Sequence, residues 1–146
     1  MTEELKAKAC RIWEEIFPNA DVERLAEVIA EDSIDHGARP DEPHGLAGVE
    51  QTMLWLRRVF SDQRWEIRQV IGEGELVVVY CTFHGRHTGD LMGIPPTNRE
   101  VAQDYVHILR FKDGKAVEHW GLRDDMALMQ QLGALPERPA AVAAAS

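Results

Sequence analysis

The stretch of sequence that decides the fold reads GRHTG at residues 85–89, GIPPT at 93–97, YVH at 105–107, EHWG at 118–121 and QLG at 131–133. Within it, Glu100–Phe111 and Lys115–Leu122 are rich in β-branched and aromatic residues, which predicts two strands. The intervening Lys112-Asp113-Gly114 suits a three-residue hairpin turn, so we expect these strands to be antiparallel. Gly89–Asn98 contains Gly93 and two prolines, which cannot support a strand ladder, and is predicted to be a loop.

The hairpin turn predicts which side chains share a face. If Phe111 pairs with Lys115, then His107 lies opposite His119 and Tyr105 lies opposite Gly121, and directly opposed residues share a face. That face carries Gln103, Tyr105, His107, Leu109, Val117, His119, Gly121 and Arg123. It mixes reactive polar groups with apolar walls, as ligand cavities do. A two-residue loop would instead shift the register and carry Trp120 to the face of His107.

The rest of the chain predicts helices first and strands second. We expect a helix from Thr2 that Pro18 ends, a short helix after Asn19 or Asp21 that includes Ile29, a strand at Ser33–His36, a loop at His36–Gly45, a helix over Val49–Phe60, strands at Trp65–Ile71 and Leu76–His87, and a last helix that Asp124 or Asp125 caps and Gly133 ends. This order is typical of an α+β domain. We expect one domain over residues 1–136 and a disordered tail over 137–146.

Composition narrows the function classes. The chain has 146 residues and a net charge of −9, which argues against nucleic acid and against anionic membranes as partners. No signal-peptide segment and no apolar run near 18 residues is present, so a cytoplasmic protein is expected. Cys10 and Cys81 lack the spacing of a metal or redox motif. His84 and His87 are three residues apart, but on a strand that spacing points them to opposite faces, so no metal site is expected, and no cofactor is expected either.

The quoted motifs resemble those of the SnoaL-like polyketide cyclases, small enzymes of the nuclear-transport-factor-2-like superfamily. The resemblance covers roughly residues 5 to 133. It implies a cone, in which a curved antiparallel sheet is wrapped by three to four helices around a central cavity, and it implies a two-fold homodimer through the sheet. In the cyclases of this family a catalytic aspartate directly follows the His-Arg or His-Trp pair on the last strand. Here that position is Gly121.

The candidate catalytic residues are His107, His119 and Asp124. The resemblance implies that His107, in the motif Val106-His107-x-x-Arg110, contacts substrate and assists the base. Two neighbouring imidazoles titrate together, so a His107–His119 pair predicts one neutral ring that can act as the base. Asp124 fits either a helix cap or a displaced base that compensates for Gly121.

Further residues are candidates for contacts with substrate. The predicted substrate-binding residues are His36, His87, Tyr105, Trp120 and Gly121. Tyr105 is expected to donate a hydrogen bond to a developing enolate. His87 is equally consistent with a structural role that ties down the 89–98 loop, and Trp65 and Trp55 are predicted to be packing residues.

The sequence leaves three functions open. The first is a cofactor-independent cyclase, isomerase or lyase that performs acid/base chemistry on a hydrophobic cyclic or polyketide-like carbonyl substrate. The second is a hydrolase that activates water against an epoxide. The third is a non-catalytic dimer that binds a hydrophobic small molecule. A homodimer is expected in each case, because the face with Val106, Ile108, Trp120 and Leu122 is too apolar to be left in water.

Overall fold

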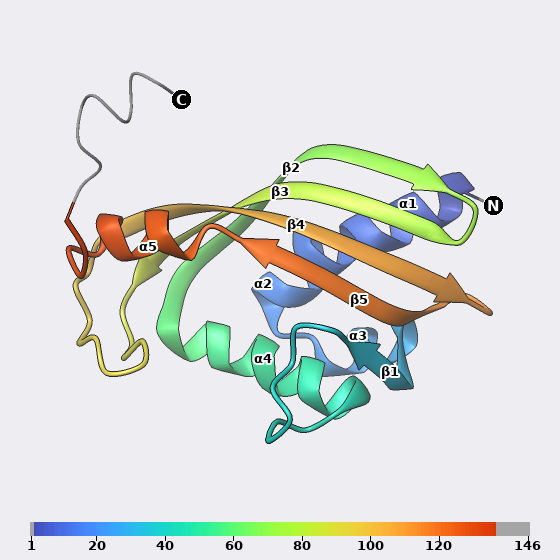
Figure 1. Cartoon of the computed structure of the whole chain (residues 1–146), viewed down its shortest axis with the longest axis horizontal. Coiled ribbons are helices and arrows are strands. Elements are labelled where there is room, and N and C mark those ends of the chain that lie inside the picture. The colour runs from blue at the N-terminus through green and yellow to red at the C-terminus, as the bar shows by residue number, and fades with distance from the viewer. Residues whose placement is uncertain (1, 137–146) are drawn as a thin grey trace.

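The computed structural model describes residues 2–136 (Figure 1). The helical elements are α1 (Thr2–Arg11), the π-helical turn η1 (Ile12–Ile16), α2 (Phe17–Asn19), α3 (Val22–Val28), α4 (Gly45–Val59) and α5 (Asp125–Gln131). The strands are β1 (Ile29–Asp35), β2 (Phe60–Glu73), β3 (Leu76–His87), β4 (Glu100–Lys112) and β5 (Lys115–Arg123). The predicted tail at 137–146 lies outside the described residues.

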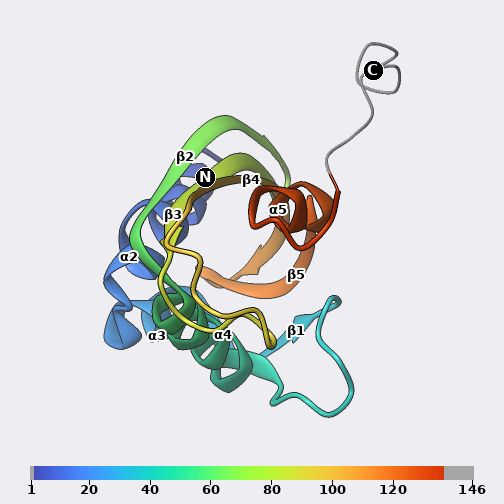
Figure 2. The same ribbon diagram turned by 90° about the vertical axis from the view of Figure 1, so that its left-hand side faces the viewer.

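The strands form one sheet in the order β1-β5-β4-β3-β2. β2 to β5 are antiparallel neighbours, as predicted, but β1 runs parallel to β5, so the sheet is mixed rather than purely antiparallel. The sheet is strongly curved, because α4 contacts both β1 and β2, which lie at its opposite edges. Seen end-on, the strands curl around the interior and α4 closes the open side (Figure 2). The predicted α+β fold with a curved sheet covered by helices is therefore confirmed.

Three helix boundaries differ from the sequence prediction. Pro18 does not end the first helical segment: it lies in α2, which directly continues the π-helical turn η1. The segment ends instead at Ala20, which adopts a left-handed conformation (φ 49°). Ile29 and Phe60, both expected on helices, begin β1 and β2 directly after α3 and α4. β-Branched and aromatic residues such as these favour the extended conformation of the first residue of a strand.

The β4–β5 hairpin differs from the predicted register, but the predicted faces survive. The turn has two residues, because Lys112 pairs with Lys115, and this change alone would invert the faces. A β-bulge follows at once, since Phe111 pairs with Ala116 whereas Arg110 pairs with Glu118. Together the shorter turn and the bulge move the pairing register by two residues, which returns each side chain to its predicted face. His107 therefore lies opposite Gly121 rather than His119, yet both histidines stay on one face.

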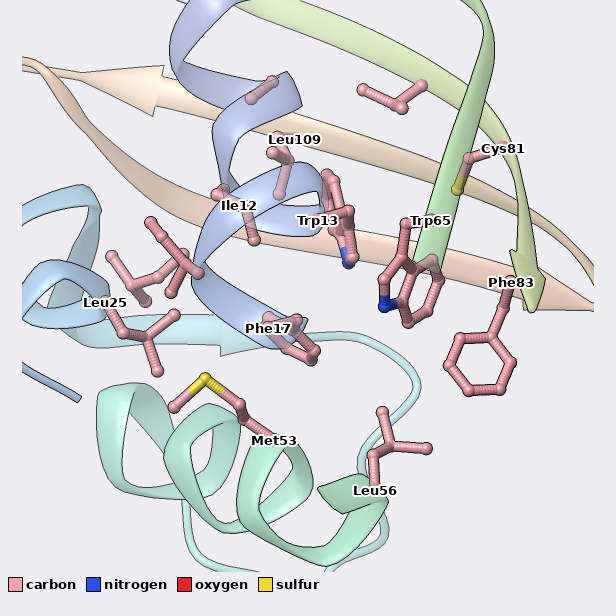
Figure 3. Close-up of a cluster of buried hydrophobic side chains, with 14 of the residues drawn as sticks. Ile12, Trp13, Phe17, Leu25, Met53, Leu56, Trp65, Cys81, Phe83 and Leu109 are labelled. Atoms are coloured by element: carbon pink, nitrogen blue, oxygen red, sulfur yellow. The ribbon is translucent and has the colours of Figure 1, made fainter. Parts of the chain in front are cut away.

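Aromatic side chains fill much of the space between the helices and the sheet. Trp13 of η1, Trp65 of β2 and Phe83 of β3 are buried there (Figure 3). Met53 and Leu56 of α4 face them from the helical side. Each such side chain contributes about 1.5–3 kcal/mol by leaving water. The face of the sheet that looks toward this core is called the inner face below, and the opposite one the outer face.

No helix within residues 2–136 combines the length and the apolar character that crossing a membrane requires.

Candidate functional site

A chain of hydrogen bonds joins three side chains of the inner face. The parallel pairing of β1 with β5 places Asp35 beside His119, and Asp35 Oδ1 lies 3.2 Å from His119 Nδ1. The other ring nitrogen, His119 Nε2, lies 2.9 Å from Nδ1 of His107 on β4. We call this chain the Asp35–His119–His107 relay. It runs from the buried interior to solvent, because exposure rises from 5% for His107 to side-chain values of 26% for His119 and 39% for Asp35.

The relay assigns the hydrogens on both rings. A carboxylate can only accept, so His119 Nδ1–H donates to Asp35. With His119 uncharged, its Nε2 accepts, and His107 Nδ1–H is the donor across the 2.9 Å contact. This leaves the lone pair on Nε2 of His107. That atom is buried and has no hydrogen-bond partner within residues 2–136. The arrangement presents an unprotonated imidazole nitrogen inside the protein, held in one tautomer by a carboxylate two groups away.

Burial and neighbouring charge keep His107 neutral. Desolvation is the main cause that lowers the pKa of His107 well below 6.5, and the positive charges of His119, when it is protonated, and of Arg123 add to it. At Asp35 burial opposes ionisation. The hydrogen bond from His119 and the Gly37 N–H outweigh it, so the pKa of Asp35 is lowered from its ordinary value. Near neutral pH the relay therefore consists of a neutral base at its inner end and a carboxylate at its outer end.

Gly121 makes room for the relay. A Cβ atom at this position would lie 2.9 Å from Cε1 and 3.3 Å from Nε2 of His119, and 3.8 Å from Nδ1 of His107. The first of these distances is shorter than carbon atoms tolerate, so any side chain would displace the His119 ring. The imidazole thus occupies the space into which a residue-121 side chain would project.

Aromatic rings hold His107 in place. Its ring stacks on that of Trp13 with a centroid distance of 3.8 Å and an interplanar angle of 15°. It also stacks on the Tyr105 ring, with a centroid distance of 5.3 Å and an interplanar angle of 20°. Burial is the main cause that raises the pKa of Tyr105 to about 12, so its phenol keeps its proton at neutral pH and can donate a hydrogen bond. A base, a donor and apolar walls therefore meet on one face.

The inner face is open to solvent at the end of β5. Gly121 and Arg123 are exposed although they belong to this face. Arg123 Nε donates to Asp125 Oδ1 at 2.9 Å, and the buried Gln103 donates to the same oxygen at 3.0 Å. This cluster places a guanidinium beside Tyr105, which is its pairing partner in the sheet.

Asp124 is the N-cap of α5. Its Oδ1 accepts a hydrogen bond from the Ala127 N–H at 3.0 Å, as the cap interpretation predicts. The neighbouring Asp125, rather than Asp124, contacts the side chains of the inner face.

The structure does not bring His36 and Trp120 to the relay. Trp120 lies on the outer face, where the His36 ring stacks on it at 4.6 Å. His36 also contacts Glu118 at 2.8 Å, and Glu118 accepts from Arg110 at 2.6 Å. We call these four residues the outer cluster.

His87 anchors the loop between β3 and β4. Its Nδ1 accepts from the Thr97 N–H at 3.1 Å, and its backbone N–H and C=O bond to Arg99 and Asn98. These contacts match the structural alternative considered for this residue. His87 is nevertheless fully buried on the inner face, with its Nε2 turned to the interior and no partner for it in residues 2–136.

Two contributors were missed by sequence reasoning, namely Asp35 as the partner of His119 and Trp13 as the ring stacked on His107. Trp13 follows the spacing of a packing residue, and nothing in the local sequence marks it as part of a site. The contact of Asp35 with His119 joins residues 84 positions apart. No motif announces such a long-range parallel pairing, although a carboxylate next to a predicted short strand was visible.

Neither of two small pockets contains His107. One of about 20 Å³, enough for a single water molecule, lies beside Asp35, between the 36–44 loop and the first turns of α4. The other lies on the solvent side of α4, along Ala47, Gln51, Leu54 and Arg58. Within residues 2–136, no three His, Cys, Asp or Glu side chains are grouped so that they could hold a metal ion.

Comparison with known proteins gives a consistent result. Residues 7–132 match the family model for SnoaL-like polyketide cyclase. The chain is 33% identical over 102 residues to nogalonic acid methyl ester cyclase of Streptomyces nogalater, which covers 69% of this chain and 73% of that protein. It is 28% identical over 122 residues to aklanonic acid methyl ester cyclase DnrD of Streptomyces peucetius, which covers 82% of this chain and 84% of DnrD.

Solved structures agree. The crystal structure of AclR from Streptomyces galilaeus, described as a candidate hydroxylase, has a TM-score of 0.84 and 28% identity, and covers 100% of this chain and 95% of AclR. TsrD from Streptomyces laurentii has a TM-score of 0.85 at 22% identity over 92% of this chain and 98% of TsrD, which supports the fold. Because residues 7–132 match the family model and the relatives above agree with it, the chain belongs to the SnoaL-like polyketide cyclase family.

Proposed function

We propose that this protein is a cofactor-independent enzyme that removes a proton from a carbon next to a carbonyl group, in a hydrophobic cyclic or polyketide-like substrate. The observation that carries the proposal is the Asp35–His119–His107 relay, which leaves an unprotonated, buried nitrogen at His107 Nε2. The names of the related cyclases, which describe methyl esters of polyketide acids, support this class of substrate.

The chemistry can be written for the groups present. His107 Nε2 takes the proton from the C–H bond, and the electron pair of that bond moves onto the carbonyl oxygen to give an enolate. The positive charge that forms on His107 is shared along the relay toward Asp35. The enolate can then attack a second carbonyl, take a proton at another carbon, or expel a leaving group, which are the cyclase, isomerase and lyase outcomes.

Tyr105 is the donor proposed for the enolate oxygen. Its phenol stays protonated because burial raises the pKa of Tyr105 to about 12, and its ring stacks on that of His107. A hydrogen bond aimed at the position where charge develops is worth most in a water-poor site. Arg123, at the open end of the same face, adds a positive field.

In this proposal His119 and Asp35 replace the aspartate that the family resemblance implies at position 121. The carboxylate acts through His119 rather than on the substrate. A carboxylate that orients an imidazole and stabilises its charged form is a known way to raise the efficiency of a histidine base.

The test is hydrogen exchange at a carbon acid. The purified protein is incubated in D₂O with 2-tetralone, a bicyclic ketone with one aromatic ring, and loss of the signal of the protons next to the carbonyl is followed by NMR. Exchange that exceeds free imidazole at the same concentration by at least about a hundredfold is expected from a positioned base.

Other results point to the alternatives. Binding of 2-tetralone without exchange, for this and for a series of related ketones, contradicts the enzyme proposal and favours a binding module. Ring opening of styrene oxide without ketone exchange favours the hydrolase.

We further propose a homodimer formed through the outer face. This face carries Val106, Ile108 and Trp120 on the central strands, and Leu122 is 78% exposed. Ile34 at the end of β1 is also exposed on this side. Large apolar patches of this kind usually mark interfaces.

A further inference from the structure

The buried polar side-chain atoms without partners gather on the inner face. Within residues 2–136 there are four of them: Gln63 Oε1, Trp65 Nε1, His87 Nε2 and His107 Nε2. All four side chains come from β2, β3 and β4, and the pairs Trp65–Phe83 and Phe60–His87 fix the face of β2 and β3. Native proteins leave few such atoms unpaired, because each one costs about 1–3 kcal/mol. Such atoms are therefore candidates for contacts with a ligand.

Two of the four stand out. Gln63 and His87 each satisfy their other polar atom locally, through Phe60 O and the Thr97 N–H. Trp65 has one polar atom, the indole N–H, and it is unpartnered although the residue is 4% exposed. His107 Nε2 is the lone pair left at the end of the relay. The ring centroids of Trp65 and His107 lie 6.0 Å apart, so an unpartnered donor and an unpartnered acceptor lie in the same part of the interior.

The surroundings of this pair are flat and apolar. The Tyr105 ring packs against both rings, with centroid distances of 4.9 Å to Trp65 and 5.3 Å to His107. The centroid of the Phe83 ring lies 4.8 Å from that of Trp65. Figure 3 shows the indole nitrogens of Trp13 and Trp65 on the side that faces α4, away from the sheet. Such rings stack well on a planar ligand.

We infer that Trp65 Nε1 and His107 Nε2 form a subsite for one oxygen of a flat ring system, a phenolic or enolic hydroxyl. The indole N–H donates to that oxygen, and the hydroxyl donates to His107 Nε2. When the hydroxyl loses its proton to His107, the oxygen carries the charge and accepts from both Trp65 and the new imidazolium. Atoms balance, since one proton moves from oxygen to nitrogen and no other reactant is needed.

This inference rests on the proposed function for the role of His107, and it adds Trp65 as a donor that no sequence motif indicated. Gly121 and Arg123, at the exposed end of β5, mark the proposed entry. Because both atoms are buried, the ligand displaces aromatic packing around Tyr105 and Trp13 rather than filling a preformed void. The interior thus stays closed until a ligand with a suitable oxygen satisfies both atoms.

The test compares 2-naphthol with naphthalene, which differ by one hydroxyl. Dissociation constants are measured by fluorescence with the full chain, for the natural protein and for a variant with 3-benzothienylalanine at position 65. This analogue has the shape of tryptophan with sulfur in place of N–H. The natural protein is expected to prefer 2-naphthol, and the analogue is expected to reduce that preference about five- to tenfold, the size of one hydrogen bond, with naphthalene binding unchanged.

A second readout uses stability. Removing an unsatisfied buried donor should raise the melting temperature of the free protein by a few degrees, whereas the same analogue at Trp55, half-buried on α4, should change neither the temperature nor the preference. Trp65→Phe provides a genetically encoded variant with the same expected loss of preference.

An unchanged naphthol-to-naphthalene ratio in both Trp65 variants overturns the inference, as does failure of the natural protein to prefer 2-naphthol. These outcomes are separate from the ketone exchange assay. If the protein exchanges the ketone protons but its naphthol-to-naphthalene ratio does not depend on Trp65, the proposed function stands and the subsite is rejected. If the ratio depends on Trp65 but no exchange occurs, the subsite stands and the proposed function is rejected.

Discussion

The inner and outer faces of the sheet carry the same kinds of group in two different settings. Asp35 and His36 are consecutive residues, yet Asp35 turns inward to His119 and His36 turns outward to Glu118. Each face therefore pairs a histidine with a carboxylate. On the outer face, His36 lies in solvent with its side chain 41% exposed, and Glu118 also bonds to Arg110. On the inner face, a second histidine, His107, follows His119 in the chain of hydrogen bonds and is almost fully buried.

The difference shows which kind of histidine–carboxylate pair keeps a nitrogen that can react with another molecule. In the outer cluster each charged group meets its partner directly, and water screens the interaction, so little is left to act on another molecule. In the relay, the carboxylate orients His119, His119 orients His107, and the last nitrogen remains free. Burial lowers the pKa of His107, which keeps that nitrogen unprotonated. Reactivity follows from burial combined with an unused hydrogen-bonding atom.

The largest expected effect is the loss of the base. His107→Gln should reduce exchange of 2-tetralone about 10²–10⁴-fold, because glutamine cannot take the proton. On the outer face His84 contacts Glu66 at 3.0 Å, and His84→Gln is a matched control that should change the rate less than twofold. Equal losses in the two variants would break the distinction between the faces.

Adding a side chain beside the relay should have the next largest effect. Gly121→Ala brings Cβ within 2.9 Å of His119 Cε1, so the ring must move and its hydrogen bond to His107 weakens. Because a displacement of about 1 Å can cost up to a hundredfold, we expect a loss of about 10- to 100-fold in exchange rate. Leu122→Ala, the next residue on the other face, is the control.

Gly121→Asp sharpens the same comparison. It supplies the carboxylate that the family resemblance implies, but at the position that His119 now occupies. We expect it to lose activity as Gly121→Ala does. Full activity in the aspartate variant would mean that the relay is dispensable.

The outer face should control assembly. The natural chain is expected to show a mass of twice 16.5 kDa by light scattering at micromolar concentration. Leu122→Lys places a charge in the exposed apolar patch and should shift the population toward monomer. A natural chain that is monomeric under these conditions would remove the dimer proposal and leave the outer cluster without a partner.

Stability should depend on pH through the inner face. The pKa of His107 is depressed in the folded protein, so the unfolded chain binds the proton more tightly, with a pKa of about 6.5. The stabilising contribution of neutral His107 is present above that pH and is lost as the pH falls below it. Between pH 8 and pH 5 the melting temperature of the natural protein should therefore decrease more than that of His107→Gln. Parallel curves for the two proteins would show that His107 is not buried as described.

The smallest expected effect concerns Asp124. As the N-cap of α5 it should contribute about 1 kcal/mol to stability, so Asp124→Ala should lower the melting temperature slightly and leave the exchange rate nearly unchanged. Asp124→Ser keeps a capping oxygen and is the control. A hundredfold loss of activity in both variants would instead identify Asp124 as the base and make the relay a structural feature.

Local sequence determined most of the elements and the face on which the histidines lie. Alternation along β4 and β5 put Tyr105, His107, His119 and Gly121 together, because side chains on a strand alternate with a period of two. Two register shifts of one residue each preserved that parity. Residue type and position predicted a cap at Asp124 or Asp125 and the end of α5 at Gly133, since both features depend on local backbone geometry, and the structure selects Asp124 as the cap.

Only the tertiary structure decided what those residues do together. The β1–β5 pairing brings Asp35 to His119 across 84 residues, and η1 lays Trp13 on His107. Neither contact has a local signature, because strand order and helix docking depend on which apolar surfaces are buried together. The same reason explains Gly121, which reads as a missing aspartate in the sequence and in the fold is the gap that a neighbouring imidazole requires.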